Sequence, residues 1–186
     1  MKKSPINIGF DDAKFEFKSA SKKTSLIGVV CQGIRMVDVI REEIAIDGHD
    51  ATTALISIVK QKEKHIQYIF TDSITFAGFN IINLKQIFKR TGKPIIAITE
   101  KLVDLDAVKT ALIKNFPKDY KVKFNNIIKA GDLYETQLET AGGTSKIFFH
   151  CVGIDSNEVN SLLSKVCVDS KLPESVRLAH LIGKAL

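Results

Sequence analysis

The sequence lacks the features that mark membrane, secreted and multi-domain proteins. It has no run of about 20 apolar residues that would span a bilayer, and the short apolar stretch after the basic N-terminus ends at Gly9, too early for a signal peptide. Repeats, low-complexity tracts and linkers rich in Pro, Gly or Ser are also absent. We therefore expect one cytoplasmic domain over residues 1–186, without a membrane partner.

Cysteine is scarce and poorly placed for chemistry. Cys31, Cys151 and Cys167 are odd in number and far apart, which argues against a zinc knuckle or a paired redox motif. We expect three free thiols in a reducing compartment. What is plentiful is positive charge, with a net charge of +6 and a pI near 9.2. Such a balance is compatible with nucleic acid as a partner, although many basic domains bind none.

The first third of the chain is typical of strands. Apolar and polar residues alternate over 6–12, which predicts a strand that ends at Asp11 and Asp12. Segments 24–31 and 35–46 are rich in β-branched residues and flank a short turn that contains Gly33. We expect three antiparallel strands here.

From Asp50 the apolar spacing changes to three and four residues, which predicts a helix with Asp50 as its N-cap. The elements expected after it are a strand over 66–72, a helix from 84 to Gly92, a strand over 94–98 and a helix over 105–116. Beyond Phe124 we expect a helical or irregular piece to about Glu139, a turn at 142–143, a strand over 146–152, a helix over 157–168 and a last helix from Pro173. Three antiparallel strands followed by parallel βαβ units is the order of the ribonuclease H-like fold, a mixed sheet flanked by helices.

Three of the predicted strands end on aspartate, namely Asp11, Asp47 and Asp72. In a sheet of this order the carboxyl end of the first strand lies beside the carboxyl end of the strand over 66–72, which is the first parallel strand. Asp11 and Asp72 would then be neighbours, and their carboxylates repel unless a proton or cation lies between them. Carboxylate oxygens are ligands that Mg²⁺ or Mn²⁺ prefers. Taken alone, each aspartate is more typical of a turn or a helix cap than of a metal ligand. Because three of them converge, metal binding and a purely structural role are equally good interpretations. For Asp12 we favour the start of a turn toward Lys14 over a role as an acceptor beside the site.

Four segments carry a resemblance to a known family. They follow one another along the chain as 9–12 (GFDD), 46–52 (IDGHDAT), 71–80 (TDSITFAGFN) and 172–180 (LPESVRLAH). These segments resemble the signature blocks of the largely archaeal DUF99 (UPF0215) family, also called endonuclease dU. That family is similar to endonuclease V, a ribonuclease H-like, Mg²⁺-dependent enzyme that nicks strands near deaminated bases.

The resemblance implies a role for each matching residue. Asp11, Asp47 and Asp72 match the carboxylates of endonuclease V and would act as catalytic ligands of Mg²⁺ or Mn²⁺. Arg177 and His180 would stand near a His-Arg pair on the final helix. Two interpretations of His180 remain open, a proton shuttle and a packing residue.

Departures from endonuclease V weaken what is implied about the base. Ser73 follows the third carboxylate, where endonuclease V has glycine and a His-Gly, and His180 comes three residues after Arg177 rather than directly before it. No counterpart of the Pro-Tyr-Ile-Pro wedge is present. The resemblance therefore implies metal chemistry more firmly than base choice.

The segment after Asp72 carries two aromatic residues and a glycine. Phe76 and Phe79, with Gly78 between them, would stack on a flipped or unpaired base, and Asn80 would read a base edge. The alternative is a hydrophobic staple at Phe79 with Asn80 as N-cap of the next helix, which we favour for Phe79 and less for Phe76. The basic residues that follow would track phosphates or form a solvated face: Lys85, Lys89, Arg90 and Lys93.

Together these observations predict a Mg²⁺- or Mn²⁺-dependent endonuclease of DNA repair, which hydrolyses phosphodiester bonds in DNA near uracil or hypoxanthine. Two other classes remain open. One is a non-catalytic module that binds nucleic acid or protein, and the other is a metal-dependent phosphohydrolase of small nucleotides.

Overall fold

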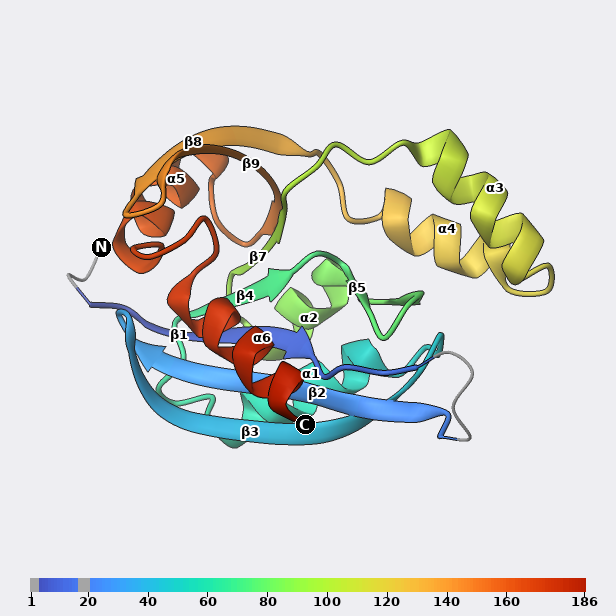
Figure 1. The fold of residues 1–186 in the computed structure, drawn as a ribbon, viewed down its shortest axis with the longest axis horizontal. Helices are drawn as coiled ribbons and strands as arrows, with labels where there is room; N and C mark the ends of the chain where they lie inside the picture. The colour runs from blue at the N-terminus through green and yellow to red at the C-terminus, as the bar shows by residue number, and fades with distance from the viewer. Residues whose placement is uncertain (1–3, 17–20) are drawn as a thin grey trace.

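A seven-stranded mixed sheet forms the centre of the computed structural model, which describes residues 4–16 and 21–186 (Figure 1). Residues 1–3 of the basic N-terminus lie outside the described part. The strand order is β3-β2-β1-β4-β7-β9-β8. These strands are β1 (Ile6–Asp12), β2 (Lys23–Gln32), β3 (Arg35–Ala45), β4 (Tyr68–Asp72), β7 (Ile95–Thr99), β8 (Tyr134–Thr140) and β9 (Gly143–Val152).

The remaining elements are six helices and a small hairpin within the described residues. The helices are α1 (Ala51–Gln61), α2 (Leu84–Thr91), α3 (Leu105–Asn115), α4 (Tyr120–Ile128), α5 (Ser156–Val166) and α6 (Glu174–Ala185). The hairpin pairs β5 (Thr75–Phe76) with β6 (Asn80–Ile81).

Strand directions confirm the predicted ribonuclease H-like sheet. β1, β2 and β3 are antiparallel neighbours, β4 lies parallel to β1, and β7 lies parallel to β4. β9 and β8 then add two antiparallel strands beyond β7. The carboxyl ends of β1, β4 and β7 consequently meet at one edge of the sheet.

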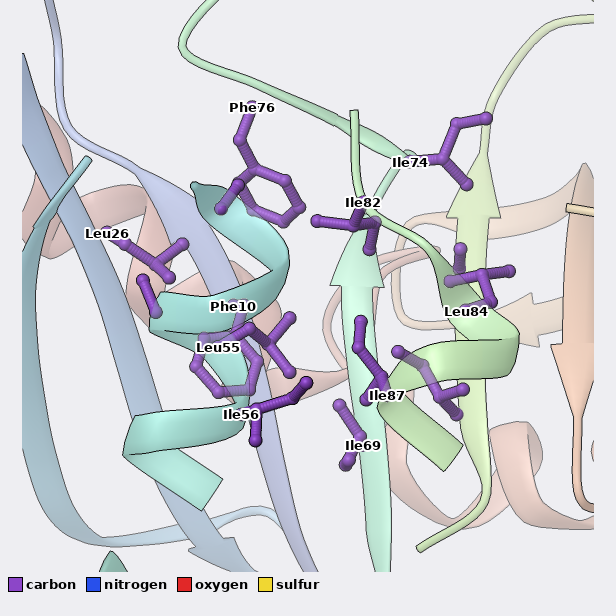
Figure 2. Close-up of a cluster of buried hydrophobic side chains, with 14 of the residues drawn as sticks. Phe10, Leu26, Leu55, Ile56, Ile69, Ile74, Phe76, Ile82, Leu84 and Ile87 are labelled. Atoms are coloured by element: carbon purple, nitrogen blue, oxygen red, sulfur yellow. The ribbon is translucent and has the colours of Figure 1, made fainter. Parts of the chain in front are cut away.

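Helices cover both faces of the sheet. α1 and α2 bury one face through the main apolar core, part of which Figure 2 shows around Phe10, Leu55 and Ile69. α6 crosses β1 and β2 on the other face, and α5 packs beside β8. α3 and α4 pack on each other to one side, near the hairpin and the carboxyl ends of β4 and β7 (Figure 1). None of the described helices is both long and apolar enough to cross a membrane.

The region from Phe124 to Glu139 differs from its prediction. It contains the end of α4 and a regular strand, β8, rather than a helical or irregular piece. β8 buries Thr136 and Leu138 against the sheet while its alternate residues face outward. A strand whose buried positions include threonine shows only a faint apolar alternation, which explains the error. The three cysteines are free, as expected.

Candidate active site

The ends of β1 and β4 bring two of the predicted carboxylates together. Phe10 pairs with Thr71 across the two parallel strands, so the next residues, Asp11 and Asp72, lie side by side at the same edge. At this separation the charge of Asp72 is among those that raise the pKa of Asp11. The strand pattern thus predicted this pair correctly.

Gly9 explains how α6 reaches the same place. A Cβ on Gly9 would overlap the backbone of Ser175 and Val176, so only glycine allows α6 to lie this close to β1. On that helix His180 is one of the residues that face the strand end, and its Nδ1 lies 2.7 Å from Oδ2 of Asp11. The structure therefore joins His180 to the acidic residues, and its role as a proton shuttle stays a prediction.

Asp12 belongs to this group as well. It still lies in β1, and its Oδ2 accepts a hydrogen bond of 3.0 Å from the backbone N–H of Ala77 in the β5–β6 hairpin. The favoured interpretation of Asp12, a turn toward Lys14, is therefore wrong. Asp12 instead ties the hairpin to the strand end.

Burial is the largest cause of the pKa shifts of the three carboxyls. Burial, followed by the charges of Asp12 and Asp72, raises the pKa of Asp11 to about 6, although hydrogen bonds from His180 and from the Asp12 N–H act against the rise. Burial also raises the pKa of Asp12. For Asp72, burial and then the nearby Glu100 raise the pKa. The cluster is thus short of positive charge.

The donor set fits a hard divalent cation. Carboxylate oxygens are the groups that Mg²⁺ and Mn²⁺ prefer, and within residues 4–16 and 21–186 no Lys or Arg forms a salt bridge with Asp11, Asp12 or Asp72. In the same ranges no three His, Cys, Asp or Glu side chains already surround one point as metal ligands. Holding a cation would therefore require the carboxylates to turn toward a common point.

Asp47 lies on the far side of the hairpin from Asp12. Its backbone is in the left-handed region, with φ of 56°, its N–H donates to the carbonyl of Ala77, and its Oδ1 accepts from the N–H of Phe79 at 2.8 Å. The carboxylate thus holds the hairpin. Its expected role as a third metal ligand stays a prediction.

Two residues expected to touch a base are enclosed instead. Phe76 is 1% exposed and lies among the core side chains above α1 (Figure 2), so the stacking role expected for it is corrected to packing. Asn80 is fully buried, and its amide accepts from the N–H of Ala51 and donates to Asp50 and to the carbonyl of Ala45. Asn80 therefore caps α1 from a distance, while Asp50 makes no cap bond of its own.

Phe79 and Gly78 occupy the tip of the same hairpin. Gly78 has φ of 84°, a conformation that favours glycine. Phe79 packs edge-on against Phe116 at the end of α3, with ring centroids 5.4 Å apart, so the staple beneath α2 is wrong, and Asn83 is the N-cap of that helix.

Phe79 also lines a cavity of about 650 Å³ between the hairpin, the end of β7 and the α3–α4 pair. Its wall is mostly apolar, with polar groups from Ser73, Thr75, Thr99 and His150. The Nδ1 of His150 lies 2.9 Å from the carbonyl of Asp132, and burial lowers its pKa. Since Ser73 directly follows Asp72, the cavity adjoins the acidic edge.

Arg177 does not join the carboxylates at the strand ends. Its guanidinium binds both carboxylate oxygens of Glu174, at 2.8 and 2.6 Å, and lies 3.8 Å from Asp169. These contacts hold Arg177 at the start of α6, so its expected contact with a substrate stays a prediction.

Sequence reasoning missed Lys123, a lysine that is 1% exposed in α4. A signal was present, because Phe116, Tyr120, Lys123 and Ile127 recur at helical spacing and place the lysine on the apolar stripe. The cavity was not foreseeable in the same way, since its walls come from segments far apart in the chain.

Comparison with known proteins places the chain in a family. Residues 6–186 match the endonuclease dU family. A UPF0215 protein of Methanocaldococcus jannaschii is 37% identical over 180 residues, which cover 95% of this chain and 91% of that protein. Another, from Pyrococcus horikoshii, is 35% identical over 188 residues, covering 100% and 94%.

Solved structures agree with the fold. The crystal structure of an Archaeoglobus fulgidus protein of unknown function has a TM-score of 0.84 and 26% identity, over 97% of each chain. Ciona intestinalis endonuclease V, in complex with a 24mer DNA containing an inosine followed by a ribo-adenosine, has a TM-score of 0.60 and 14% identity, covering 95% of this chain and 83% of that one. At that identity the likeness is one of fold. The match along almost the whole sequence is decisive for the family, and this chain belongs to the endonuclease dU family.

Proposed function

We propose that the protein is a Mg²⁺- or Mn²⁺-dependent endonuclease of DNA repair, which hydrolyses phosphodiester bonds in DNA near deaminated bases, uracil or hypoxanthine. The observation that carries the proposal is that Asp11, Asp12 and Asp72 lie together at the strand ends beside His180, without a salt bridge to Lys or Arg among the described residues. Family membership and the fold shared with a DNA-bound endonuclease V support the same reaction.

The chain's own groups divide the work. Asp11 and Asp72 would hold the cation, with Asp47 as the proposed third ligand. The chemistry that such a cation supplies is a lower pKa for the attacking water and compensation of charge on the phosphate. His180 donates or accepts through Nδ1 toward Asp11, which leaves Nε2 to pass a proton to or from the reacting oxygen. Its side chain is 42% exposed, so solvent and substrate can reach it.

The cavity beside Ser73 is the proposed place for the altered base. Its volume of about 650 Å³ falls in the range of small-molecule pockets, and Phe79 supplies an aromatic ring to its wall. A base that leaves the stack needs an apolar slot with a few polar groups to read its edge. Basic residues exposed on α2, Lys85, Lys89 and Arg90, are proposed to contact the backbone.

A nicking assay tests the proposal. Duplex and single strands that carry one uracil or one hypoxanthine are incubated with the protein and Mg²⁺, Mn²⁺ or a chelator, beside undamaged strands. We expect cleavage only with metal and only near the altered base. Asp72→Asn should abolish cleavage, whereas Glu63→Gln, at an exposed carboxylate far from the strand ends, should not.

Two results would overturn the proposal. Turnover of free nucleotides with intact strands would indicate the small-nucleotide phosphohydrolase. Strand binding that is unaffected by Asp72→Asn, without any cleavage, would indicate a non-catalytic module.

A further inference from the structure

Lys123 makes an unusual set of contacts for a buried cation. Its Nζ donates to three backbone carbonyls, those of Asp47 at 2.8 Å, Gly48 at 2.9 Å and Phe79 at 2.8 Å. An ammonium group has three N–H donors, and all three are therefore matched. The lysine links α4 to two segments that lie about 75 and 44 residues away in the sequence.

This arrangement is costly compared with an apolar side chain. Removing an ammonium group from water costs several kcal/mol unless hydrogen bonds and charges compensate. Burial lowers the pKa of Lys123, while Asp47 and Asp119 act in the opposite direction, and the Phe116 ring lies 5.1 Å from Nζ. A methionine would fill the same space without this cost, so packing alone does not explain the lysine.

The contacts of Lys123 fix the position of the backbone beside the acidic residues. The turn at Asp47 and the hairpin exchange two hydrogen bonds, from Phe79 N–H to the Asp47 carboxylate and from Asp47 N–H to the Ala77 carbonyl. Ala77 in turn donates its N–H to Asp12. Lys123 holds both partners of this exchange by their carbonyls. A continuous chain of hydrogen bonds thus runs from α4 to the end of β1.

We propose that Lys123 is a positioning residue of the acidic site, which fixes the Asp47 turn and the hairpin so that the N–H groups of Ala77 and Phe79 stay on the Asp12 and Asp47 carboxylates. Its effect on cleavage rests on the proposed function, whereas its effect on the two N–H groups does not. The lysine also fastens the α3–α4 pair, one wall of the cavity, to the same hairpin.

Amide hydrogen exchange of Lys123→Met tests the positioning directly and needs no metal or substrate. We expect the N–H groups of Ala77 and Phe79 to exchange about tenfold faster, the equivalent of one hydrogen bond lost, while amides in β7 keep their wild-type rates. Lys121→Met, at an exposed lysine on the same helix, should leave all of them unchanged. Lys123→Gln keeps a polar end with fewer donors and should give a smaller acceleration, so the test does not depend on one variant folding.

Leu112→Ala separates positioning from general loosening. Leu112 is buried in α3 and makes none of the three carbonyl contacts, and its truncation weakens the packing of the α3–α4 pair by about 2–5 kcal/mol. If it accelerates Ala77 and Phe79 exchange as much as Lys123→Met does, or if Lys123→Met accelerates neither, the positioning role is refuted.

Metal binding and cleavage give the second readout. We expect Lys123→Met to weaken Mn²⁺ binding roughly 10- to 100-fold, as loss of a group that orients a ligand does, and to lower kcat of nicking more than it changes KM. Faster exchange in a protein whose wild type neither binds Mn²⁺ nor nicks would overturn the proposed function while supporting the positioning. Unchanged exchange beside an active wild type would overturn the positioning alone.

Discussion

Replacing Asp11 by asparagine should make the metal-free protein more stable while abolishing cleavage. The folded protein raises the pKa of this carboxyl from 3.8 to about 6. Such a rise means that ionised Asp11 costs the folded state about 3 kcal/mol, at roughly 1.4 kcal/mol for each tenfold change in acidity. Asparagine never ionises, and its amide oxygen can still accept the N–H of Asp12. The pKa of about 6 already includes the hydrogen bond from His180, which lowers it, so the expected gain is about 3 kcal/mol.

The gain should depend on pH in one direction. Between about pH 4 and pH 6 the folded wild type holds more protons at Asp11 than the unfolded chain, so its stability falls as pH rises through this window. Asp11→Asn lacks that fall. The free energy of unfolding of the variant should therefore equal that of the wild type near pH 4 and exceed it increasingly as pH rises through this window. Above about pH 6 the full difference remains.

Urea unfolding of the metal-free protein at several pH values measures this difference. At neutral pH the gain of about 3 kcal/mol corresponds to a melting temperature roughly 6–12 °C higher for a chain of this size. Glu63→Gln is the matched control, because it removes an exposed carboxylate. A variant that is less stable than the wild type at neutral pH, or a gain that is the same at pH 4, would refute the reasoning and make Asp11 a structural residue.

Three further substitutions test how the fold supports the site. Gly9→Ala should push α6 off β1 and separate His180 from its carboxylate partner, lowering kcat strongly, which steady-state nicking and a crystal structure would detect. Asn80→Ala should lower the free energy of unfolding by about 2–4 kcal/mol, since it removes the cap on Ala51 and two further bonds; denaturant unfolding measures this, and an unchanged midpoint would contradict it. Phe79→Ala should raise KM for strands with an altered base at least severalfold and leave binding to undamaged DNA unchanged, as fluorescence anisotropy and nicking would show.

Much of the sheet was predictable because its information is local. Alternating residues located β1 and the ends of β1 and β4, and a fixed strand order then placed Asp11 beside Asp72. The same pattern contained no sign that Asp12 would receive an N–H from Ala77, 65 residues away. Asp12 ends β1 and contacts a hairpin whose position depends on tertiary packing.

The segment after Asp72 shows why the base contacts were harder to predict. Aromatic residues beside a glycine fit an exposed loop and a buried hairpin equally well. The outcome depends on Asn80, whose three hydrogen bonds to 45–51 draw the hairpin onto α1 and enclose Phe76. Of the two aromatic residues in this segment, only Phe79 lines the cavity. Because the hydrogen-bond partners of Asn80 are distant in the sequence, the pattern around it does not show that it is buried.

The acidic edge and the groups around it have opposite effects on stability. Burial raises the pKa of all three carboxyls, and no Lys or Arg in the described part of the chain forms a salt bridge with them, so each ionised form weakens the fold. Asn80 and Lys123, in contrast, stabilise the neighbouring backbone. They donate hydrogen bonds to the carbonyls of Ala45 and Asp47, in the turn that lies against the hairpin. Carboxylates that served only the fold would be improved by amides, which keep the shape without the charge. Acids at these positions, beside a backbone fixed by hydrogen bonds, are therefore what the proposed cation site requires.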